Sequence, residues 1–155
     1  MIPLNDAQRR ELSDLISTGR LREAPQDRER ADVFLAHARE GLDASAHIPT
    51  PHVAFDAAYN AAHDAGEALM AALGVRPGRG DGAHATVGSV LVMMAEDSSF
   101  ASSARAYDAL RQTRNRVRYD ASHVGEAQAH HARQVATDLL TFVAQVLDSS
   151  DGGPT

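Results

Sequence analysis

The sequence predicts an all-α fold, an up-and-down bundle of four to five helices with an extra N-terminal helix. Aromatic residues make up only 5% of the chain and alanine is abundant, a composition that favours closely packed helices over sheets. Apolar residues recur at helical spacing in several segments, and no segment alternates between apolar and polar residues as a half-buried strand does. With 155 residues, the chain has the length of one domain.

The N-terminal helix is predicted from its capping residues. Asn5 and Gln8 have the spacing of a capping box, and apolar residues follow at helical intervals. A helix is therefore expected over residues 5–18, ending at Gly19. Together with a linker it forms an N-terminal segment, residues 1–24.

The next two helices are predicted from proline and glycine positions. Proline is tolerated at the first position of a helix, so a second helix is expected from Pro25 to about Ala44. Thr50 is expected to cap a third helix that starts at Pro51. Gly74 is expected to end this helix, because glycine readily adopts the left-handed conformation.

Three further helices follow from apolar spacing and helix-breaking residues. They are expected over residues 83–95, 100–119 and 125–148. Ser98 or Ser99 is expected to cap the second of these three. The helical bundle is thus predicted to span residues 25–148, and residues 149–155 to form a disordered tail.

Composition also narrows the classes of function. The chain has no cysteine, which excludes disulfides and thiolate zinc sites and favours a reduced, cytoplasmic setting. The first residues lack the basic and apolar regions of a signal peptide, and the apolar stretches are too short to span a bilayer. No membrane association is expected. The formal net charge of −6 argues against a DNA-coating protein.

One helix concentrates positive charge. Five of the chain's 15 basic residues lie within 14 positions: Arg105, Arg111, Arg114, Arg116 and Arg118. Four residues at steps of four, three and four share one helical face: Tyr107, Arg111, Arg114 and Arg118. Like charges at this spacing repel by about 0.2–0.5 kcal/mol per pair, so carboxylates or an anionic ligand are needed to neutralise them.

Two interpretations of this arginine face remain open from spacing alone. The functional one is a site for RNA or nucleotide phosphates, because guanidinium groups bind phosphate through two parallel hydrogen bonds. The structural one is a solvated face whose arginines pair with neighbouring acids such as Asp108 and Glu126.

Two stretches of the sequence carry a resemblance to a known family. Residues 58–74, AYNAAHDAGEALMAALG, resemble the central helix of HEPN domains, and His84 resembles a histidine that often opens the next helix there. Residues 110–120, LRQTRNRVRYD, resemble the family's signature helix, especially its variants that end in Asp-Tyr-Asp. The resemblance covers roughly residues 28–147.

Membership of this family implies a four-helix core that usually dimerises and brings two signature helices across a shared cleft. Many members are metal-independent endoribonucleases, often toxins paired with a nucleotidyltransferase-type antitoxin. Their signature is an arginine, a polar residue and a histidine after four to six intervening residues. Arg114 and Asn115 match its first two positions. The chain departs at the third, because no histidine follows at that spacing and position 119 is a tyrosine.

The resemblance assigns roles for RNA cleavage. Arg114 would hold the scissile phosphate, and Asn115 would orient Arg114 or the ribose. Tyr119 is a poor base but a usable donor to a phosphate oxygen, and it is also a candidate modification target. His123 is a candidate general base or an exposed loop residue. Further phosphate contacts are expected from Arg111, Arg116 and Arg118.

No metal site and no cofactor are predicted. His130 and His131 are adjacent and point about 100° apart on a helix, and the repeated Glu-x-x-His pattern of di-metal bundles is absent. The leading hypothesis is a HEPN-family homodimer that binds or cleaves RNA, within a toxin–antitoxin or defence pair. The alternative is a non-catalytic HEPN module that binds a nucleotide or a nucleotidyltransferase partner.

Overall fold

The structure is a computed structural model that describes residues 1–152. Within these residues, six helices and two short strands follow the order α1 (Asp6–Ser17), β1 (Leu21–Glu23), α2 (Arg28–Ser45), α3 (Pro51–Leu73), β2 (Val75–Pro77), α4 (Ala83–Ala95), α5 (Ala101–Tyr119) and α6 (Glu126–Asp151). The predicted all-α helical bundle is therefore confirmed.

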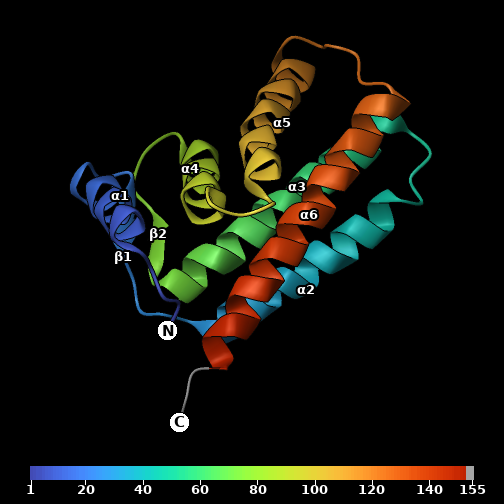
Figure 1. The fold of residues 1–155 in the computed structure, drawn as a ribbon. Coiled ribbons are helices and arrows are strands. Elements are labelled where there is room, and N and C mark those ends of the chain that lie inside the picture. The colour runs from blue at the N-terminus through green and yellow to red at the C-terminus, as the bar shows by residue number, and fades with distance from the viewer. Residues whose placement is uncertain (153–155) are drawn as a thin grey trace.

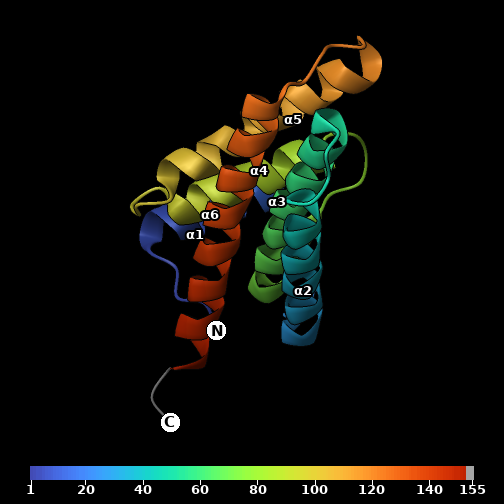
Figure 2. The same cartoon turned by 90° about the vertical axis from the view of Figure 1, so that its right-hand side faces the viewer.

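Helix α3 is the centre of the bundle. It packs against α2, α4, α5 and α6, and 12 of its 23 residues are buried. In Figure 1, α2 and α6 run beside α3, whereas α4 and α5 lie on its other side and α1 and the two strands sit at one end. Figure 2 shows the last turns of α5 and the following loop extending past the end of α3.

Small residues bring the helices close together. A Cβ added to Gly66 of α3 would lie 2.3 Å from a Cγ atom of Val87 in α4. A Cβ added to Gly88 of α4 would lie 2.9 Å from the ring of Tyr107 in α5. Both glycines therefore set the distance between neighbouring helices, and Gly88 makes room for a buried aromatic ring.

Several predicted helix ends are confirmed. Asn5 and Gln8 cap α1 reciprocally, each side chain accepting a hydrogen bond from the other's backbone N–H, at 2.8 and 2.9 Å. Helix α3 begins at Pro51 and ends at Gly74, whose φ of 80° is left-handed. A β-carbon is disfavoured at that angle, which is why glycine ends the helix there.

Two expected helix starts are corrected. Helix α2 begins at Arg28 rather than Pro25, because Asp27 is its cap and accepts a hydrogen bond from the backbone N–H of Arg30 at 2.8 Å. Neither predicted serine caps α5. Its N-cap is Phe100, whose backbone N–H donates to the hydroxyl of Ser98.

The two strands are an unexpected element. Leu21 pairs with Pro77 and Glu23 with Val75 in a two-stranded antiparallel sheet. Each strand has three residues, too few to display the alternation by which a strand is recognised. The pairing holds the segment that follows α1 against the segment that follows the C-terminal end of α3.

The C-terminal boundary also differs from the expectation. Helix α6 continues through Ser149 to Asp151, whose carboxylate accepts a hydrogen bond from Arg28 at 2.6 Å. The rest of the predicted tail, residues 153–155, lies outside the described residues. No helix in residues 1–152 combines the length and apolar character required to cross a membrane.

Alanine substitutions at two helical glycines should have opposite effects. Gly66→Ala should lower the free energy of unfolding by about 1–3 kcal/mol, because the added methyl overlaps Val87. Gly41→Ala in α2 should raise it by about 0.5–1 kcal/mol, because its nearest neighbours would be 3.8 Å away and alanine favours the helix. Urea unfolding measures both. Equal effects of the two substitutions would contradict the close approach of α3 and α4.

Candidate functional site

Four side chains from three helices form a hydrogen-bonded chain beneath the arginine face. Their order is His63, Tyr107, Tyr59 and His84. The Tyr107 hydroxyl lies 2.9 Å from Nδ1 of His63 and 3.2 Å from the Tyr59 hydroxyl, which lies 2.7 Å from Nδ1 of His84. We call these four residues the tyrosine–histidine chain.

The helices position this chain through local spacing. Tyr59 and His63 are one turn apart on α3, so they share a face. His84 lies in the first turn of α4, two residues after Gly82, whose φ of 96° redirects the backbone into the helix. Tyr107 comes from α5 and packs against Gly88. The chain therefore ties α3, α4 and α5 together.

The two tyrosines are fully buried, whereas both histidines keep partial contact with solvent. The imidazole rings of His63 and His84 stack with centroids 4.0 Å apart and planes inclined by 14°. The Nε2 of His63 lies 3.4 Å from a carboxylate oxygen of Glu67, one turn further along α3. Two imidazoles thus lie side by side at the edge of the core, with the carboxylate next to one of them.

Burial and charge shift the pKa values of these groups. Burial, with the neighbouring His63 and Arg114, lowers the pKa of His84 from 6.5 to about 4. Burial also raises the pKa of both tyrosine hydroxyls above their usual value. At neutral pH, His84 is therefore a neutral imidazole and the tyrosines are neutral hydroxyls.

Arg114 is the arginine of α5 that lies against this chain. Its guanidinium carbon is 5.2 Å from the centre of the Tyr59 ring, a distance typical of a cation–π contact. Its Nε is buried without a hydrogen-bond partner, and no carboxylate within residues 1–152 forms an ion pair with it. A buried cationic donor without a partner is unfavourable unless a ligand supplies one.

The neighbouring arginines are arranged differently. Arg111 donates from Nε to Asp108 at 2.8 Å, which lowers the pKa of that carboxyl and neutralises the arginine. Arg118 is exposed and lies 3.8 Å from a carboxylate oxygen of Asp56. The exposed Arg116 donates to the hydroxyl of Thr113.

The remaining sequence-predicted residues do not join Arg114. Asn115 is partly buried, Tyr119 is 83% exposed and His123 is exposed in the loop after α5. In the described part of the chain, no hydrogen bond or ion pair connects any of the three with Arg114. Arg114 lies instead over Tyr59, whose hydroxyl is within hydrogen-bond distance of His84. The sequence did not predict the stacking of His84 on His63.

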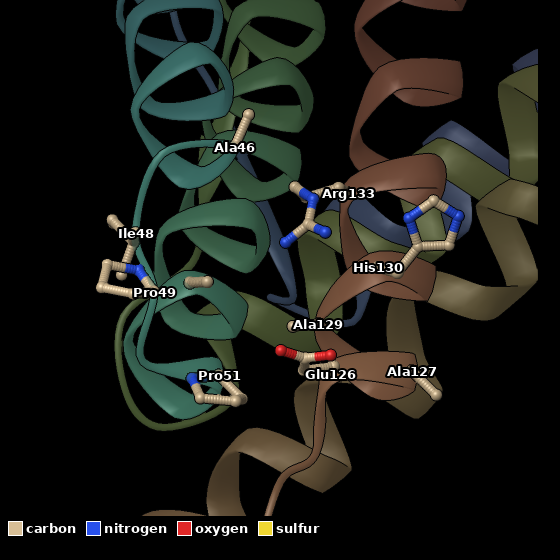
Figure 3. A pocket seen from close by; sticks show the side chains of 10 residues that line it. Ala46, Ile48, Pro49, Pro51, Glu126, Ala127, Ala129, His130 and Arg133 are labelled. Atoms are coloured by element: carbon tan, nitrogen blue, oxygen red, sulfur yellow. The ribbon is translucent and has the colours of Figure 1, made fainter.

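A cavity beside the start of α6 lies away from Arg114. Figure 3 shows a cavity of about 490 Å³ between the α2–α3 connection and the start of α6, where Glu126 and Arg133 point toward the opening and His130 lies at its side. Arg114 and the tyrosine–histidine chain do not line it. Residues 1–152 also contain no group of three or more side chains that could hold a metal ion.

Comparisons with known proteins add no relative to this picture. Neither a protein-family model, nor a curated protein, nor a solved structure matches the chain. The candidate site therefore rests on its own geometry: an unpaired guanidinium over the ring of Tyr59, and a hydrogen-bonded chain that ends in two stacked imidazoles.

The depressed pKa of His84 predicts a specific dependence of stability on pH. The unfolded histidine binds a proton below about pH 6.5, whereas the folded one does so only near pH 4. The stabilising contribution is therefore complete above pH 6.5 and is lost as the pH falls from 6.5 to 4. Over this range, wild type should lose stability more steeply than His84→Gln in urea unfolding. Parallel curves for the two proteins would contradict the assignment.

Proposed function

We propose that this protein is a HEPN-type RNA-binding protein in which Arg114 holds a phosphate of the RNA backbone. The observation that carries the proposal is the unpaired, partly buried guanidinium over the Tyr59 ring. A phosphate oxygen is the type of acceptor that the orphan Nε requires, and the planar guanidinium can bind two phosphate oxygens at once.

The contrast between two arginines supports this choice over a purely structural role. An ordinary ion-paired face would neutralise every arginine with a nearby acid, as Asp108 does for Arg111. Arg114 lies three residues further along the same helix and has no such partner within the described residues. Arg116 and Arg118 are exposed toward the end of α5 and are suited to further phosphates along the strand.

The proposal includes a homodimer formed through the end of α5. This end extends past α3 in both views and carries Tyr119, a large aromatic side chain that is 83% exposed (Figures 1 and 2). Exposed aromatic residues are enriched in protein interfaces. Two copies of α5 meeting there would place two arginine faces beside one RNA, and a nucleotidyltransferase-type antitoxin would be the partner of such a toxin.

The second candidate is a non-catalytic module that binds a nucleotide or a nucleotidyltransferase partner through the same arginine. It is favoured by the absence of the motif histidine and by the exposure of His123 away from any contact with Arg114. The two candidates share the anion at Arg114 and differ in whether RNA is the preferred ligand.

Substitution of Arg114 should weaken RNA binding selectively. Arg114→Ala should raise the dissociation constant for a single-stranded RNA about tenfold or more, because a charge-assisted hydrogen bond contributes about 1.5–3 kcal/mol. The slope of log affinity against log salt should fall by about 0.7. Fluorescence anisotropy over a salt series measures both quantities.

The matched control is Arg105→Ala, which removes an exposed arginine from the same helix. This variant should bind RNA nearly as wild type does. Equal losses in the two variants would contradict a dedicated role of Arg114 and leave only general attraction to a basic helix. ATP or GTP bound more tightly than RNA would favour the second candidate.

Substitution of Tyr119 should affect association rather than folding. Tyr119→Ala should change the free energy of unfolding of the monomer by less than about 0.5 kcal/mol, since its side chain is exposed. It should raise the dimer dissociation constant about tenfold, the effect expected for an aromatic interface residue. Sedimentation equilibrium measures this, with Val33→Ala on α2 as the control. A wild-type chain that stays monomeric at all concentrations would contradict the dimer.

A further inference from the structure

Within residues 1–152, two buried side-chain atoms have no hydrogen-bond partner. One is Nε of Arg114, a donor, and the other is Oδ1 of Asp56, an acceptor. Buried polar atoms without a partner are uncommon in folded proteins, because each one costs free energy that a partner would recover. Both atoms belong to residues at the contact between α3 and α5. The contact therefore combines one unsatisfied donor with one unsatisfied acceptor.

Helical spacing places these two atoms on neighbouring turns. Asp56 and Tyr59 are three residues apart on α3, and Arg114 and Arg118 are four residues apart on α5, so each pair shares a helical face. The guanidinium carbon of Arg114 lies 5.2 Å from the centre of the Tyr59 ring, and Nη2 of Arg118 lies 3.8 Å from Oδ2 of Asp56. The two contacts are therefore about one helical turn apart along both helices.

The two carboxylate oxygens of Asp56 have different surroundings. Oδ2 faces the exposed Arg118 at 3.8 Å, a distance too long for a hydrogen bond but short enough to offset the negative charge. Oδ1 is buried and accepts no hydrogen bond. An anionic ligand can therefore approach this carboxylate, and Oδ1 requires a single donor. A ligand group that donates two parallel hydrogen bonds, as guanidinium does, would need both oxygens.

A ribonucleotide carries such a donor beside an anion. Its 2′-hydroxyl and its 3′-phosphate are attached to adjacent carbon atoms of the ribose, so they lie close together in every nucleotide of an RNA strand. The amino groups of the bases are further from the phosphate and change with the base sequence. With a phosphate on Arg114, the donor that reaches the neighbouring turn irrespective of base sequence is the 2′-hydroxyl. DNA lacks this group.

We propose that Asp56 distinguishes RNA from DNA by accepting a hydrogen bond from a ribose 2′-hydroxyl at Oδ1. The proposal rests on the RNA-binding function proposed above and adds to it the group by which the sugar is recognised. Three observations carry it: the buried Oδ1 without a partner, Arg118 beside the other oxygen, and the unpaired Arg114 on the neighbouring turn. The role is one of binding, in which no covalent bond is formed or broken.

A contrast with two other acidic residues of the same helices supports this role. Glu67 of α3 lies 3.4 Å from a histidine nitrogen, and Asp108 of α5 accepts a hydrogen bond from Arg111 at 2.8 Å. Asp108 thus shows the close pairing expected of a carboxylate that neutralises an arginine. Asp56 has two arginines of α5 on its side of the bundle and hydrogen-bonds to neither. Its buried oxygen is therefore suited to a group from outside the chain.

The test compares three single strands of one base sequence: RNA, 2′-fluoro RNA and DNA. A 2′-fluorine keeps the RNA-like conformation of the sugar but cannot donate a hydrogen bond. The full wild-type chain should bind RNA about tenfold or more tightly than either of the other strands, the effect of one hydrogen bond to a charged group. Fluorescence anisotropy measures the three dissociation constants, and gel electrophoresis verifies that each strand is intact after the titration.

Asp56→Ala should abolish this preference. The variant should bind the three strands with dissociation constants within about twofold of one another, because it lacks the acceptor. Its affinity for 2′-fluoro RNA should be no lower than that of wild type, since this strand has no hydroxyl to lose. The matched control is Asp43→Ala, which removes an exposed carboxylate from α2 and should retain the full preference for RNA.

Urea unfolding provides a second measurement that needs no ligand. Asp56→Ala should raise the urea midpoint, because it removes a buried oxygen that no protein group satisfies and because alanine favours the helix. A lower midpoint would mean that Oδ1 already has a partner within the protein, and it would overturn the proposal.

The outcomes separate this inference from the function on which it rests. Wild-type protein that binds RNA and 2′-fluoro RNA equally well would overturn the role of Asp56 and leave the RNA-binding proposal standing. A preference for RNA that persists in Asp56→Ala would do the same. Wild-type protein that binds none of the three strands would overturn the RNA-binding proposal, and the role of Asp56 with it.

Discussion

Two buried hydroxyl groups constrain this molecule more than any other polar contact. Tyr59 and Tyr107 are fully enclosed, and a buried hydroxyl without a partner costs about 1–3 kcal/mol. They satisfy each other and then require His63 and His84, which come from different helices. The register of α3, α4 and α5 is therefore fixed by hydrogen bonds as well as by packing, and two polar imidazoles are held at the edge of an alanine-rich core.

The tyrosine–histidine chain also distinguishes one arginine of α5 from the others. Five arginines on one helix would be an ordinary charged surface if all of them pointed into water or paired with acids. Arg111 does pair, with Asp108, and Arg116 is exposed. Only Arg114 has its guanidinium over the ring of Tyr59 with a buried and unpartnered nitrogen, among the arginines of the described residues. The same tyrosine thus positions both an imidazole and the cation that is proposed to bind phosphate.

Local signals predicted most of the fold, whereas the site depended on contacts that no local signal contains. The bounds of α3 and α4 follow from Pro51, Gly74 and the apolar spacing, because caps and breakers act within one turn. Arg114 was found from its charge and spacing. The stacking of His63 on His84 was not predicted from the sequence, because it requires α4 to fold back against α3. His123 was predicted as a site residue only from its spacing to the arginines in the sequence. Its side chain is exposed.

The central claim is that the tyrosine–histidine chain holds His84 as a partly buried, neutral imidazole. Nitrogen-15 NMR of the His84 ring between pH 6.5 and pH 4 tests it directly, because protonated and bare ring nitrogens have well separated chemical shifts. The account predicts that His84 stays neutral, with a proton on only one ring nitrogen, until the pH approaches 4. A His84 ring that takes up its second proton near pH 6.5 would contradict it.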